Sequence, residues 1–128
     1  MSRIICSSLE FVFTNEVKSI NEENIPVLND GIEWKKVNTE EKLVYQSNIK
    51  QNDAGPTNEE TVSVSIREKT YIDSIIKLLI EYCGFYTILR LRTDDKIFYV
   101  GSLEYPCVME HTSNKVISNI SFRAISPT

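Results

Sequence analysis

The sequence predicts a single mainly β domain (α+β), an antiparallel β-sandwich or barrel with one amphipathic helix. Several short runs alternate apolar and polar residues, as half-buried strands do. One run repeats its apolar residues at helical spacing. The 128 residues match the usual size of one domain, so residues 1–128 are expected to share one core. Because the helix falls between groups of strands, we expect it to pack on a face or an end of the sheet.

The predicted strands are rich in β-branched, aromatic and alternating apolar residues and are bounded by turn residues. They are residues 8–17, 32–37, 41–49, 61–68, 85–92, 96–100, 108–111 and 116–125. In the first of them, Leu9, Phe11 and Phe13 share one face. Residues 18–30 are mostly polar and contain Pro26, and we therefore expect a loop there.

Strands 41–49 and 61–68 predict a long β-hairpin, because they flank a segment rich in turn residues. The expected tip spans 50–60, contains Gly55 and Pro56, and has no large apolar residue. Such a tip is expected to be exposed and mobile in the isolated protein.

The helix is predicted over 70–83, where five residues fall on one apolar stripe. These are Ile72, Ile75, Ile76, Leu79 and Cys83. Thr70 is a suitable N-cap, and Gly84 is the expected stop after the last turn.

No catalytic, cofactor-binding or metal-binding set is evident, so we do not expect an enzyme. The single histidine, His111, has no nucleophile motif around it. Cys6, Cys83 and Cys107 are odd in number and far apart, which predicts buried thiols in a reducing compartment. The four glycines are isolated, so no phosphate-binding loop is present.

The formal net charge is −4, from 14 basic and 18 acidic residues, and no basic patch is visible. Sequence-specific DNA binding is therefore not expected. A mildly acidic protein can surround DNA without sticking to it. No stretch approaches the length of a transmembrane helix, so no membrane partner is expected.

The segment Lys96–Pro106, KIFYVGSLEYP, combines a strand ending in Tyr-Val-Gly with an aromatic-Pro pair. It resembles small virion structural proteins of tailed bacteriophages that infect Bacteroidetes. The hairpin, the helix and the closing strand are similar in order to those of that group. The resemblance implies a tail-tube-like fold and a virion component, in the tail tube or at the neck and tail completion ring. Tail-tube proteins form hexameric rings that stack around the DNA channel.

In such a ring, the polar hairpin tip is expected to contact the neighbouring subunit. The expected contact residues are Lys50, Gln51, Asn52, Asp53, Gly55, Pro56, Asn58 and Glu59. The expected partners are further copies of this chain and other virion proteins, while DNA passes without specific binding and no cofactor is needed. Assembly in the host cytoplasm and localisation in the virion are implied by the same resemblance.

The residues leave two alternatives open. One is a monomeric protein-binding module, such as a phage- or host-encoded inhibitor, whose aromatic residues form an exposed patch. Trp34 and the tyrosines fit either that patch or ordinary strand packing. The other alternative is a small enzyme centred on His111.

Overall fold

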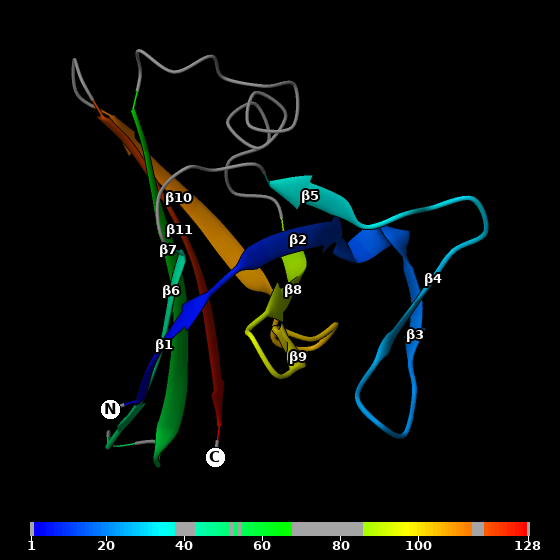
Figure 1. The fold of residues 1–128 in the computed structure, drawn as a ribbon. Coiled ribbons are helices and arrows are strands. Elements are labelled where there is room, and N and C mark those ends of the chain that lie inside the picture. Colours follow the sequence, from blue (N-terminus) through cyan, green and yellow to red (C-terminus); the bar gives the residue numbers. More distant parts are fainter. Residues whose placement is uncertain are drawn as a thin grey trace.

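The computed structural model describes residues 2–37, 43–51, 53, 55–67, 86–113 and 117–127 (Figure 1). In this part of the chain nearly all regular structure is β-strand, with one 3-10 turn, η1 (Thr14–Glu16). The prediction of a mainly β, antiparallel domain is confirmed. The helix predicted over 70–83 lies outside the described residues, as does Cys83.

Among the described residues, nine strands form one sheet, and two more form a small separate sheet. The strands are β1 (Ser2–Cys6), β2 (Ser8–Phe13), β3 (Val17–Ile20), β4 (Pro26–Leu28), β5 (Lys35–Val37), β6 (Leu43–Lys50), β7 (Thr57–Arg67), β8 (Tyr86–Arg92), β9 (Ile97–Val100), β10 (Cys107–Ser113) and β11 (Ile117–Pro127). The large sheet has the order β1-β6-β7-β11-β10-β8-β2-β5, with β9 also on β8, and β3 pairs with β4. Every pairing is antiparallel.

The first two strands join opposite parts of the large sheet. Only Ser7 separates β1 from β2, yet β1 pairs with β6 while β2 pairs with β8. At this junction the Ser7 N–H donates a 2.7 Å hydrogen bond to the carbonyl of Arg92. One continuous stretch of chain therefore curls the sheet around its own interior, and Figure 1 shows it crossing from β6 to β8.

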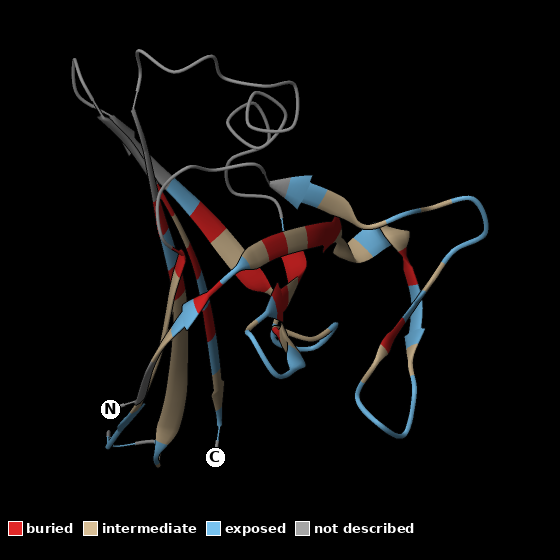
Figure 2. Cartoon of the chain, in the orientation of Figure 1, coloured by how far each residue is buried: buried red, intermediate tan, exposed pale blue. Residues whose placement is uncertain are grey.

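The main core fills that interior and draws on all eight strands that surround it. Its buried members are Cys6, Leu9, Phe11, Leu43, Val62, Val64, Leu89, Leu91, Val100, Cys107, Met109, Ile120, Phe122 and Ala124. They occur mostly at alternate positions, which gives the strands of Figure 2 their banded burial. The predicted core face of the first strand is confirmed at Leu9 and Phe11, and Val62 and Val64 of the hairpin are also buried.

The predicted loop over 18–30 is wrong in part, because β3 and β4 form a short hairpin there. Pro26 is tolerated because it begins an edge strand, where no ladder N–H is required. Val17 packs with Val12 and Ile88 in a second cluster on the outer face of β2 and β8. This outer cluster anchors the base of the β3–β4 arm, which projects from the body in Figure 1.

The start of the chain also differs from the prediction. The sequence indicated no strand before residue 8, but β1 is the partner of β6. The strand predicted over 8–17 is interrupted by η1. Here the Glu16 carboxylate accepts a 2.9 Å hydrogen bond from the Phe13 N–H, which turns the chain between β2 and β3.

The hairpin formed by β6 and β7 is confirmed, and its turn is shorter than the predicted 50–60. The last strand pair is Lys50 opposite Thr57, which leaves 51–56 for the turn. The polar residues at both ends of the predicted turn instead belong to β6 and β7, where they pair with residues of the opposite strand. Lys50, for example, lies 2.8 Å from the Glu59 carboxylate.

Gly101 allows the chain to leave β9 for the loop that precedes β10. Its φ is +89°, and a Cβ built there lies 3.0 Å from Cys107 Sγ and 3.2 Å from Cys107 N. Gly31 has a similar φ of +80° but no heavy atom within 4 Å of its added Cβ. The two glycines therefore share the backbone requirement and differ in the space around them.

We expect Gly101→Ala to destabilise the domain more than Gly31→Ala, as measured by urea unfolding. Each substitution places a side chain at positive φ, at a cost of about 1–2 kcal/mol. Only Gly101→Ala adds a close approach to the buried Cys107, and its total loss should reach about 3 kcal/mol. Equal losses for the two variants would show that Cys107 moves away without cost.

Candidate functional site

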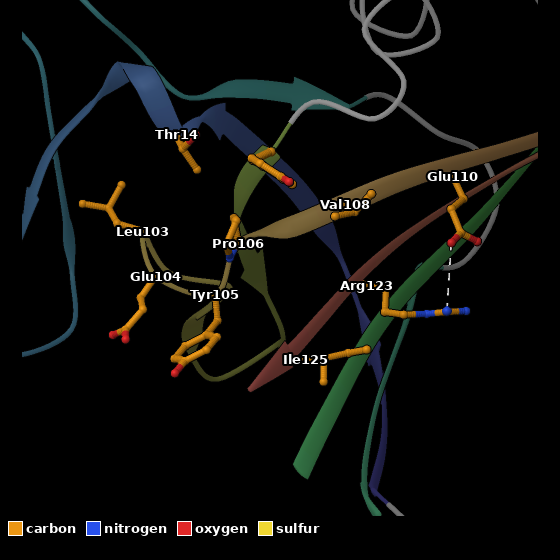
Figure 3. A pocket seen from close by; sticks show the side chains of 10 residues that line it. Thr14, Leu103, Glu104, Tyr105, Pro106, Val108, Glu110, Arg123 and Ile125 are labelled. Carbon is orange, nitrogen blue, oxygen red and sulfur yellow. Dashed lines mark ion pairs between the residues drawn. The ribbon is translucent and has the colours of Figure 1, made fainter. Parts of the chain in front are cut away.

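An open groove of about 580 Å³ crosses the outer face of β8, β10 and β11 (Figure 3). Its lining combines strand residues with the loop before β10 and one residue of η1. The lining residues are Thr14, Tyr86, Leu103, Glu104, Tyr105, Pro106, Val108, Glu110, Arg123 and Ile125.

Strand alternation places the groove residues on the outside of the sheet. Ala124 is buried in the core, so its neighbours Arg123 and Ile125 face outward. The same alternation in β10 directs Val108 and Glu110 into the groove. The groove is therefore built on the reverse side of the core strands, on a rigid support.

The groove concentrates the exposed apolar surface of the domain. Among the described residues eight large hydrophobic side chains are exposed, and four of them line this groove. The four are Tyr86, Leu103, Tyr105 and Ile125. A contiguous apolar patch bordered by charged residues marks an interaction site more often than scattered apolar residues do.

Pro106 explains why the groove is open. Extending the register between β10 and β11 would place Pro106 opposite Ile125, but proline has no N–H for a ladder bond. The chain turns away instead. The Tyr105 N–H donates to Ser102 Oγ at 2.9 Å, and the Ser102 N–H donates to the Tyr105 carbonyl at 3.1 Å.

One edge of β11 borders the groove without a neighbouring strand. β7 pairs with β11 over residues 117–127, whereas β10 pairs only with 118–123. In the part of the chain that the structure describes, no strand covers residues 124–127 on the side away from β7. Every second residue of an antiparallel strand directs its N–H and C=O to that side.

The charges around the groove are mainly acidic. Arg123 lies 3.4 Å from Glu59 and 4.0 Å from Glu110, and Figure 3 marks the second of these ion pairs. Glu59 also accepts from Lys50, and this hydrogen bond lowers the pKa of the Glu59 carboxyl. Glu104 is exposed on the groove wall. Carboxylates therefore outnumber the single guanidinium in the groove lining.

The expected contact residues lie at the end of the β6–β7 hairpin, next to one side of the groove. Lys50 and Glu59 are brought together by their ion pair, and Glu59 connects them to Arg123. Gln51, Asp53, Gly55 and Pro56 fall within the turn, Asn58 lies in β7, and Asn52 is outside the described residues. Whether this end contacts another subunit stays a prediction.

Sequence reasoning missed the groove itself because its residues come from distant parts of the chain. Tyr86 and Ile125, for instance, reach the same face only through the strand order β11-β10-β8. The one local signal is the Tyr105-Pro106 pair, because its proline interrupts strand pairing and so opens the groove.

Trp34 takes part in structural packing on the outer face of β8. The Arg90 guanidinium lies 4.7 Å from the centre of its ring, and the Tyr99 ring lies 5.8 Å from it. Glu10 holds Arg90 with two hydrogen bonds of 3.1 and 2.7 Å. The hydrogen bond from Arg90 lowers the pKa of the Glu10 carboxyl below its ordinary value. We conclude that Trp34 and Tyr99 shield a bidentate ion pair.

A second polar pair lies at one end of the core. The Tyr45 hydroxyl donates a 2.6 Å hydrogen bond to Glu60, and the Tyr45 ring meets Phe98 edge to face at 5.0 Å. Burial and the nearby carboxylate raise the pKa of Tyr45. The hydroxyl therefore stays protonated and acts as a structural donor.

The described residues show no catalytic set. Burial raises the pKa of the Cys6 and Cys107 thiols, which makes both poor nucleophiles. The backbone of His111 pairs with Ile120, and its side chain lies outside the described part. No group of three or more His, Cys, Asp or Glu side chains among the described residues is placed to hold a metal ion.

No family model, curated protein or solved structure matches this chain. Within the residues that the structure describes, no helix is long and apolar enough to cross a membrane. Function is therefore argued from the groove, the strand edges and the charges.

We expect Glu10→Gln to lower the free energy of unfolding at neutral pH by about 1–3 kcal/mol, because it removes the charged partner of Arg90. The lowered pKa of Glu10 means that its ionised form stabilises the fold above its ordinary pKa of 4.5. This stabilisation is lost as the pH falls through the lower, folded-state pKa.

Urea unfolding between neutral pH and about pH 3 should therefore be less pH-dependent in Glu10→Gln than in the unaltered protein. Glu23→Gln, at an exposed position of the β3–β4 arm, is the matched control and should leave the pH dependence unchanged. An identical pH dependence for Glu10→Gln would rule out this role of the ion pair.

Proposed function

We propose that this chain is a structural component of a tailed-phage virion, in the tail tube or at the neck and tail completion ring. It acts by homo-oligomeric assembly around the DNA channel. The observation that carries the proposal is the presence of open strand edges and an exposed apolar groove on a domain whose described residues hold no catalytic set.

Open strand edges favour assembly between identical subunits. In the described part of the chain β9 pairs only with β8, and β5 pairs only with β2. Ile97, at the start of β9, is exposed. An unpaired edge is a template for a strand of another subunit, and a head-to-tail repeat of such contacts forms a ring when the rotation between subunits closes.

The segment that resembles phage virion proteins supplies β9 and the loop of the groove. Residues 96–106 thus contribute both an open edge and an apolar wall. The curled antiparallel sheet is compatible with a tail-tube-like sandwich or barrel. The segment that resembles phage virion proteins therefore also forms exposed surface, which supports a role in assembly.

The charge of the chain supports passage of DNA without specific binding. The net charge of −4 makes the average surface repel phosphate groups. A ring lined by such a surface lets DNA move through it.

A monomeric protein-binding module is the second candidate function, and the same groove favours it. The two functions differ in oligomeric state. A module would stay monomeric at high concentration and bind one foreign protein, whereas a ring component would associate with itself.

We expect the β6–β7 turn to be required for ring formation and dispensable for folding. Replacing residues 51–56 with Asn-Gly leaves Lys50 and Thr57 as the closing pair of a two-residue type I′ hairpin. The melting temperature should stay within about 5 °C of the unaltered protein. The unaltered protein should form rings and the variant should not, as measured by light scattering after size exclusion and by electron microscopy.

A double substitution in the other hairpin, Glu22→Gln with Glu23→Gln, serves as the control and should leave the rings intact. The proposal fails if the unaltered protein remains a monodisperse monomer at high concentration, both alone and with proteins from a phage lysate.

A further inference from the structure

We infer that the groove is a docking site for an extended, basic segment of a different protein, which adds as a strand to residues 124–127 of β11. This site goes beyond the proposed self-assembly and does not depend on it. It rests on three features of the groove: an open backbone edge, an apolar lining and an excess of carboxylates.

The backbone edge determines the conformation of the occupant. β10 leaves β11 after the pair Val108 and Arg123, so the position beside 124–127 has no strand among the described residues. The full ladder with β7 holds 124–127 in extended form before any partner arrives. An incoming strand therefore forms main-chain hydrogen bonds without first having to order this edge.

The apolar lining determines the side chains of the occupant. Ile125 projects from β11 on one side of the groove, and Leu103 and Tyr105 project from the loop on the other, as Figure 3 shows. Ile125 is 50% exposed and Tyr105 is 36% exposed, so both have surface left to bury. A strand whose alternate residues are aliphatic or aromatic would cover them.

The charges determine that the occupant is basic. The groove lining carries two carboxylates, Glu104 and Glu110, and one guanidinium, Arg123, which lies 3.4 Å from Glu59 and 4.0 Å from Glu110. A lysine or arginine of the partner would meet Glu104 or Glu110 on the rim. Such rim charges mainly increase the rate of association and the specificity for the partner.

The same charges argue against the β3–β4 arm or β5 of a second copy of this chain as the occupant. The projecting β3–β4 arm carries Glu22 and Glu23 near its tip, which would repel an acidic groove. The only adjacent basic pair in the sequence lies in β5, and there the Lys35 ammonium is held 2.7 Å from Glu16. Lys36 is exposed, but it lies opposite Glu10 in the ladder of β2 and β5.

The test uses a panel of short fluorescent peptides that alternate threonine with valine, leucine or phenylalanine and carry lysines at one end. At least one member should bind the intact protein saturably in fluorescence anisotropy. The same peptide with alternate backbone nitrogens methylated should lose binding, because it cannot pair as a strand. Replacing its lysines with glutamates should weaken binding about tenfold or more.

Two substitutions in the protein locate the site. Ile125→Lys and Glu104→Lys should each weaken peptide binding about tenfold or more. Ile49→Lys is the matched control, because Ile49 is 66% exposed on β6 and does not line the groove. Binding to the Ile49→Lys protein should be unchanged, and chemical-shift changes in the amide spectrum should centre on residues 124–126.

Failure of the whole panel to bind overturns the inference, as does equal binding of the methylated peptide. Rings that fall apart on Ile125→Lys would place a second copy in the groove and also overturn it. Rings without peptide binding would refute the docking site alone. Monomers that bind the peptide would refute self-assembly alone.

Discussion

The structure depends on one stretch of chain, residues 2–13, which belongs to two distant parts of the same sheet. β1 pairs with β6 and β2 pairs with β8, and the hydrogen bond from Ser7 to Arg92 fixes the junction between them. Without that shared stretch, an antiparallel sheet of this order would expose one whole apolar face. The curvature that this stretch imposes on the sheet encloses the inner face as a core and leaves the outer face of β8, β10 and β11 as the floor of the groove.

One part of the outer face is covered by packed side chains, and another part is exposed in the groove. On β2 and β8, Trp34 covers the ion pair of Glu10 and Arg90, and a second apolar cluster lies beneath the β3–β4 arm. On β10 and β11, the described chain leaves the outer face uncovered, because Pro106 ends the pairing and the loop turns aside. The outer face of β2 and β8 is therefore covered, and that of β10 and β11 is exposed, because the connecting segments cross the first pair of strands and turn away from the second.

Local patterns predicted much of the fold. The alternation of Leu9 and Phe11 identified a core strand correctly, since a period of two residues does not depend on the order of strands in the sheet. β3 and β4 were missed because their polar residues carry no such period, and their apolar residues act only through contact with Val12 and Ile88. The groove was beyond local reasoning for the same reason, since Tyr86 and Ile125 become neighbours only through the strand order.

The dual role of the first strands has a consequence for biosynthesis. β1 and β2 are synthesised before the other strands described here, but β2 can pair only after β8 has been made, and β7 can complete its pairing only after β11 has been made. Most contacts in this domain are therefore distant in sequence, which predicts slow folding that completes only after β11 has been synthesised. Until then β7, eleven residues long, has a bare edge. The nascent protein can therefore aggregate through the edge of β7 until β11 pairs with it, although this edge is not exposed in the folded protein.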